Sequence, residues 1–161
     1  MNTTIKTSPT TTGISSAHVE LLNDMLQLNR DSAEGFAKAS ELAASAKLKT
    51  IMNGARMERE TAARAIEPLV RAAGGTPDKD LSISGSLNRT WMHVREAFSP
   101  NGDKALINEI ERAEDSMKEA YADALKKQLP PAVMSVLKVQ ANQVQAVHDT
   151  FSDLKHGRAT L

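Results

Sequence analysis

The sequence predicts an all-α protein with the architecture of a four-helix bundle. Alanine, leucine, methionine and the long charged residues are abundant, while aromatic residues make up only 3% of the chain, which is typical of helical proteins. Apolar residues recur at helical spacing in four segments, each about 25 residues and therefore about 37 Å long. Matching lengths favour a bundle, and 161 residues suit one domain with a core of its own.

The first two helices are predicted over about Ser16 to Ala43 and about Ala46 to Ala73. A reversal near Ser45 separates them, because one helix of nearly sixty residues would be unusual in a globular domain. The diglycine at 74–75 ends the second helix. The apolar face of the first helix comprises Leu22, Met25, Leu26, Ala33, Phe36 and Ala43, and that of the second comprises Ile51, Ala55, Ala62, Ala65, Ile66 and Leu69.

The third helix is predicted from about Asp103 to Lys127. The fourth opens at Pro130 and Pro131, since proline suits the first turn of a helix, and continues to about Leu154. The inward residues of the third helix are Leu106, Ile107, Ile110, Ala113, Met117, Tyr121 and Ala124, and those of the fourth are Val133, Val136, Leu137, Val144, Val147, Phe151 and Leu154.

The connection from Gly74 to Gly102 is too long for a tight turn, and its segment "SLNRTWMHVREAF" has the pattern of a short helix. A short connection, a long crossover and a short connection follow the ferritin-like order, in which helices two and three run parallel. The expected organisation is a disordered Thr-rich tail at 1–14, a ferritin-like four-helix bundle at 15–156 and a flexible C-terminus at 157–161.

Composition narrows the classes of function. Twenty basic and twenty acidic residues give a net charge of zero, which disfavours nucleic-acid binding. No stretch approaches the roughly 18 apolar residues that a membrane span requires, and the first residues lack the apolar core of a signal peptide. The absence of cysteine excludes disulfides and thiolate metal sites, and it suits a reducing compartment. We therefore expect a cytoplasmic protein that binds neither membranes nor nucleic acid.

Four polar residues fall within the predicted apolar faces, one on each helix: two lie close to the centre of the first and fourth faces, and the two glutamates lie roughly 40° (third helix) and 50° (second helix) from the centre of theirs. They are Asn29, Glu58, Glu114 and Gln140. In the ferritin-like order all four lie at one height, within about 6 Å of each other along the bundle axis. This is the level at which ferritin-like proteins hold two metal ions.

Two hypotheses account for this polar layer. In the first, Glu58, Glu114 and His148 bind a metal ion such as iron or manganese, although neither Glu-x-x-His motif of a di-iron site is present. In the second, Arg59 pairs with Glu114 and the amides complete a satisfied structural network that fixes helix register. Tyr121 lies two turns from Glu114 and could donate into the layer, although a tyrosine that merely packs in the core is the simpler interpretation.

Several motifs together resemble an uncharacterised bacterial ferritin-like four-helix-bundle family, known mainly as a domain of unknown function. The resemblance covers about Leu21 to Leu154. The motifs are "EGF" at 34–36, "AGGTP" at 73–77, "GSLNRTW" at 85–91, "ERAEDSMKEAY" at 111–121, "LP" at 129–130 and "HD" at 148–149. The resemblance implies the ferritin-like fold and a metal-related or stress-related role. It brings no established reaction.

We therefore expect a structural or protein-interaction protein rather than an enzyme, with a carboxylate-type metal protein as the alternative. Self-association into a homo-oligomer is also expected, since Ala-rich bundles pair through helix faces and zero net charge does not oppose it. The sequence identifies no protein partner.

Overall fold

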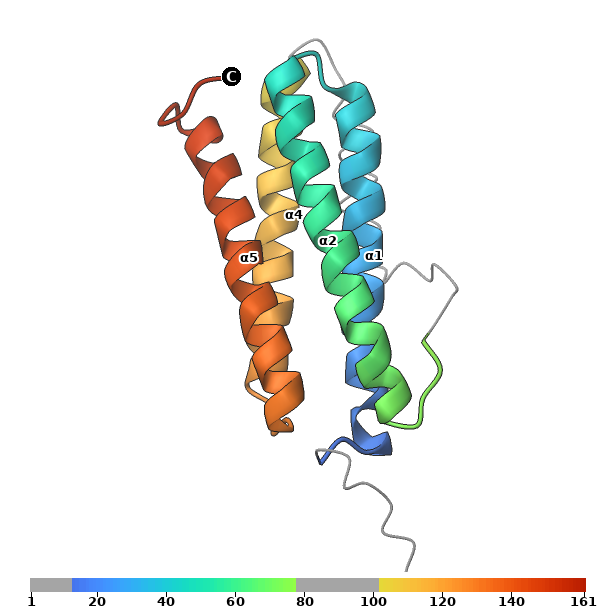
Figure 1. The fold of residues 1–161 in the computed structure, drawn as a ribbon. Helices are drawn as coiled ribbons and strands as arrows, with labels where there is room; N and C mark the ends of the chain where they lie inside the picture. Colours follow the sequence, from blue (N-terminus) through green and yellow to red (C-terminus); the bar gives the residue numbers. More distant parts are fainter. Residues whose placement is uncertain (1–12, 78–101) are drawn as a thin grey trace, which may run out of the picture.

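The computed structural model describes residues 13–77 and 102–161, and these two ranges are helical throughout apart from turns and termini. A short 3₁₀ turn, η1 (Ser16–His18), precedes four long helices (Figure 1). The four are α1 (Val19–Leu42), α2 (Ala46–Ala72), α4 (Gly102–Leu125) and α5 (Pro131–Lys155). The all-α four-helix prediction is confirmed. The short helix predicted between helices two and three, and most of the predicted tail, lie outside the described residues.

The bundle consists of two antiparallel hairpins, α1–α2 and α4–α5, packed side by side (Figure 1). Helix α2 ends and α4 begins at opposite ends of the bundle, so that α2 and α4 run in the same direction. Helix α1 neighbours α4 and α2 neighbours α5, which places α2 and α4 on one diagonal. This is the predicted order of a short, a long and a short connection. Across the described residues, none of the helices has the length and hydropathy that crossing a membrane demands.

The reversal between α1 and α2 falls at Ser45, where the sequence predicts it. The hydroxyl of Ser45 accepts a hydrogen bond from the Leu48 amide at 3.3 Å and so caps α2. The carboxylate of Asp103, at the start of α4, accepts from the Ala44 and Ser45 amides at 2.7 and 2.8 Å. The turn is therefore stabilised by a side chain from the second hairpin.

Helix α2 ends at the diglycine, as predicted. Gly74 adopts a φ of +83°, and the amides of Gly74 and Gly75 donate to the carbonyls of Arg71 and Val70. This is the hydrogen-bond pattern of a Schellman cap, which favours glycine at the left-handed position. A Cβ on Gly75 would lie 2.6 Å from a Val19 methyl, so glycine there permits the chain to pass close to α1.

The apolar core is divided into two clusters, one toward each end of the bundle. The lower cluster is built around Leu22, Ile66, Met117 and Leu137, and the upper cluster around Phe36 and its ring partner Phe151. The lower cluster also contains Ile14, which the sequence analysis assigned to the disordered tail. That boundary was wrong because Ile14 is buried: the left-handed turn at Gly13 brings the chain beside Pro130, and the isoleucine side chain packs into the core.

Residues 157–161, predicted to be flexible, are exposed but make contacts with the bundle. Arg158 forms an ion pair with Asp153 at 2.6 Å, and the Lys47 ammonium donates to the Thr160 carbonyl at 2.5 Å. Their flexibility stays a prediction.

Candidate functional site

Four buried polar side chains, one from each helix, lie between the two apolar clusters. Asn29 comes from α1, Arg59 from α2, Glu114 from α4 and Gln140 from α5, and each is at most 4% exposed. Each follows an apolar residue of its own helix at helical spacing, so it continues the buried stripe rather than the surface. From here on, the polar layer means the layer that the structure shows, which consists of these four residues together with Tyr121.

The strongest contact in the polar layer is an ion pair on the diagonal of the bundle. An Arg59 Nη atom lies 2.6 Å from a carboxylate oxygen of Glu114, and both side chains are 1% exposed. Burial raises the pKa of the Glu114 carboxyl, while the charge and hydrogen bond of Arg59 act in the opposite direction. The guanidinium and the carboxyl group are therefore each other's hydrogen-bonded partner in the middle of the molecule, which is the arrangement that makes burial of such groups tolerable.

Tyr121 joins the remaining polar side chains of the layer. Its hydroxyl accepts from the Asn29 amide nitrogen at 2.7 Å and donates to the Gln140 amide oxygen at 2.9 Å. The Gln140 nitrogen in turn donates to the Ala62 carbonyl at 3.0 Å. One chain of hydrogen bonds thus crosses the bundle from α1 through α4 and α5 to α2.

Burial also governs the chemistry of Tyr121. Removal from water raises the pKa of its hydroxyl to about 12, although the hydrogen bond from Asn29 favours the ionised form. The phenol therefore stays protonated at physiological pH, and this proton is the one that Gln140 accepts.

Two atoms of the polar layer depart from the fully satisfied network that the sequence predicts. Within the described part of the chain, Asn29 Oδ1 and Arg59 Nε have no hydrogen-bond partner. The Asn29 nitrogen also donates to the Met25 carbonyl, one turn back on α1, at 2.8 Å. Arg59 Nε has no acceptor because helix backbones leave few free carbonyls at mid-bundle height, and Asn29 Oδ1 has no donor because the backbone N–H groups there bond within their own helices.

Glu58 does not belong to the polar layer, and its assignment to the layer was wrong. Its side chain is exposed, while the next residue, Arg59, is buried. The buried face of α2 runs through Met52, Arg59 and Ala63 rather than through Ala65, which is exposed. Including Ala65 rotated the predicted face, because alanine is compatible with either side of a helix.

His148 lies away from the polar layer, near the edge of the α4–α5 interface. Its Nε2 lies 3.0 Å from a carboxylate oxygen of Asp115 and its Nδ1 lies 3.1 Å from one of Asp149. These nitrogens point to opposite sides of the ring, so the two carboxylates cannot share one ion with the imidazole. The hydrogen bond from His148 lowers the pKa of Asp149.

The three predicted metal ligands therefore do not converge. Glu114 faces a guanidinium, Glu58 is exposed, and His148 binds two carboxylates at the surface. Among the described residues, no group of three or more His, Asp or Glu side chains is placed to hold a metal ion. This donor set does not fit a carboxylate-bridged iron or manganese centre, which requires several inward carboxylates and imidazoles.

Residues 17–127 match the family described as "Domain of unknown function (DUF2383)". The chain belongs to the DUF2383 family. The match covers α1, α2 and α4, so it includes Asn29, Arg59, Glu114 and Tyr121, while Gln140 on α5 lies beyond it. The comparison with curated proteins gives no match to this DUF2383 chain.

Proposed function

We propose that this DUF2383 protein is a non-enzymatic structural or protein-interaction protein, built on a ferritin-like bundle whose polar layer fixes the register of the helices. The observation that supports this is the Arg59–Glu114 ion pair. The guanidinium supplies, inside the core, the positive charge that a metal ion supplies in a di-metal bundle.

The register argument rests on the geometry of a helix. A shift of one residue translates a side chain by about 1.5 Å and rotates it by about 100°. Such a shift of α2 would move Arg59 off its buried stripe and leave Glu114 without a counter-charge, which is strongly unfavourable. Apolar residues alone tolerate such shifts more readily, since they are interchangeable in the core.

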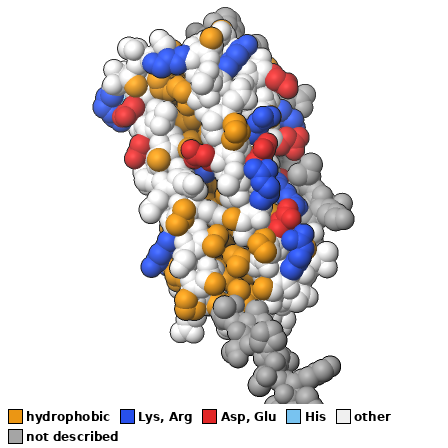
Figure 2. Space-filling model, in the orientation of Figure 1, with side chains coloured by type: hydrophobic (Ala, Val, Ile, Leu, Met, Phe, Trp, Pro, Cys, Tyr) orange, Lys and Arg blue, Asp and Glu red, His pale blue; other side chains and the backbone are white. Residues whose placement is uncertain are grey.

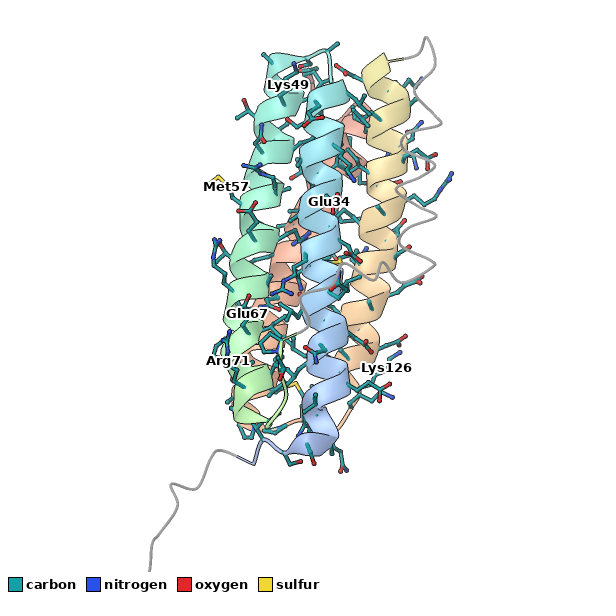
Figure 3. The ribbon with its side chains drawn as sticks, turned by 90° about the vertical axis from the view of Figure 1, so that its right-hand side faces the viewer. Glu34, Lys49, Met57, Glu67, Arg71 and Lys126 are labelled. Atoms are coloured by element: carbon teal, nitrogen blue, oxygen red, sulfur yellow. The ribbon has the colours of Figure 1, made fainter. Side chains whose placement is uncertain are left out.

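A protein-interaction role has support from the surface. Met57 on α2 is 61% exposed and Val139 on α5 is 59% exposed, and Figure 3 shows Met57 pointing away from the bundle. Figure 2 shows apolar side chains gathered over the lower part of the face that α2 and α5 form. We propose that this face mediates self-association. Sedimentation velocity of Met57→Lys and Val139→Lys, with the parent chain as reference, tests whether the oligomer dissociates.

We propose that the protein acts in the cytoplasm of a bacterial cell. It rests on the resemblance described above and on a sequence without cysteine, which suits a reducing compartment. The stress-related role that the resemblance implies belongs to the same proposal and would act through binding of a partner rather than through a reaction.

Elemental analysis of protein purified without chelator, combined with thermal melts in added Mn²⁺ or Fe²⁺, tests the structural role against metal binding. We expect less than stoichiometric metal and an unchanged melting temperature, because ions that do not bind the native state cannot stabilise it. About one or two ions per chain, lost in Glu114→Gln but retained in the exposed control Glu119→Gln, would contradict the proposal.

A further inference from the structure

A groove lined by described residues lies along the face that α1 and α4 form, and Figure 3 shows these two helices side by side. Its volume is about 920 Å³. It extends from Asp31 and Ser116 at mid-bundle height to Ala17 and Leu129 at the lower end, a length of about 20 Å along α1. Its apolar lining consists of Leu21, Met25, Leu28, Ala120, Ala124 and Leu129.

Two buried acceptor atoms lie at the mid-bundle end of this groove. Gln27 Nε2 donates to Asp31 Oδ1 at 2.7 Å, and the two side chains are 9% and 5% exposed. Among the described residues, the other oxygen of each, Gln27 Oε1 and Asp31 Oδ2, accepts no hydrogen bond. Leaving such acceptors buried and unsatisfied is unfavourable, so the site is suited to a molecule that brings hydrogen-bond donors.

The charge around the groove favours a cation. Glu20, Asp24, Asp31 and Asp123 line it, of which Asp123 pairs with Lys126 at 2.7 Å, and Lys127 is the one lysine or arginine among its described lining residues. Burial raises the pKa of the Asp31 carboxyl, and the nearby charge of Glu34 adds to this effect. Burial and the neighbouring negative charge both disfavour the ionised form of Asp31, and a positively charged ligand would stabilise that form.

We propose that this groove binds a protonated primary amine carrying an apolar chain, with the ammonium between Asp31 Oδ2 and Gln27 Oε1. The three N–H donors of an ammonium match two acceptors that no donor of the described chain reaches. The apolar chain then lies along Leu28 and Leu21 toward Leu129. This binding site goes beyond the structural role proposed above and does not depend on it.

Isothermal titration of the full chain with n-octylammonium, below its micelle-forming concentration, tests the proposal. Octanol and octanoate serve as probes with the same chain and a different head group. The key variant is Asp31→Asn, which keeps the shape of the side chain and removes its charge. Glu41→Gln is the matched control, since Glu41 is exposed on α1 and does not line the groove. A circular-dichroism melt of each variant verifies that it folds.

We expect saturable binding of one octylammonium per chain, about tenfold or more weaker in Asp31→Asn and unchanged in Glu41→Gln, because charge-assisted hydrogen bonds are the strong ones. Octanoate should not bind. Three results would each overturn the proposal: the absence of octylammonium binding, equal affinity for octanol, or equal affinity in the folded Asp31→Asn variant.

Discussion

The guanidinium of Arg59 lies 2.6 Å from the carboxylate of Glu114 across the diagonal of the bundle, with both side chains 1% exposed. A buried ion pair of this kind contributes little net stability, because removing two charges from water costs about as much as their attraction returns. It discriminates strongly between alternative packings, however, since any packing that separates the charges leaves each one buried alone. We therefore expect the pair to favour one register of the helices in a core otherwise dominated by apolar side chains.

Replacing Tyr121 with phenylalanine should destabilise the fold by about 1–3 kcal/mol. The change removes the donor to Gln140 Oε1 and the acceptor for Asn29, while it keeps the aromatic packing. Urea unfolding measures the effect, with Gln140→Leu and the double variant completing the comparison. We expect the double variant to cost less than the sum of the two single variants, because both remove the same hydrogen bond. Strict additivity would mean that the two side chains act independently.

The ionisation of Tyr121 should be shifted upward from about 10, the ordinary value for tyrosine, to about 12. It is the single tyrosine of the chain, so the ultraviolet absorbance of tyrosinate reports on it directly. The folded state holds this proton at a pH where the unfolded state has released it. Stability should therefore fall as the pH rises from about 10 toward about 12. A midpoint near the ordinary value, with the helical signal intact, would contradict the buried hydrogen-bonded phenol.

Replacing Asp103 with alanine should cost about 1–2 kcal/mol, because the Ala44 and Ser45 amides lose their acceptors and the hairpins lose a link. Asp103→Asn should recover part of this loss, since it retains one oxygen that can accept. The adjacent exposed residue, Lys104, provides the control as Lys104→Ala. If the urea midpoints of Asp103→Ala and Lys104→Ala are equal, the carboxylate does not stabilise the turn.

The sequence predicts the four helices well, because their signals are local. Apolar spacing, the prolines at the start of α5 and the diglycine after α2 each act within one or two turns of the chain. Even the first turn, which has neither glycine nor proline, was located at Ser45 from the length that a bundle helix can have. The acceptor for its amides was missed, because Asp103 lies 58 residues away in sequence.

The polar layer was only partly predictable from sequence. Asn29 and Gln140 fall close to the centres of their predicted apolar faces and Glu114 falls within its face, and all three are buried. On α2 the alanines leave the direction of the buried face ambiguous, so Glu58 was chosen beside Arg59. The groove residue Asp31 gives no signal in sequence, since its burial depends on how α1 packs against its neighbours.

The coupling between Arg59 and Glu114 tests the central claim most directly. Urea unfolding of Arg59→Met, Glu114→Leu and the double variant gives the free energies that define it. We predict that each single change costs about 3–5 kcal/mol, while the double variant lies within about 1 kcal/mol of the parent protein. Single variants that each cost under about 1 kcal/mol, or a double variant whose cost equals their sum, would show that the buried pair does not specify the packing of the bundle.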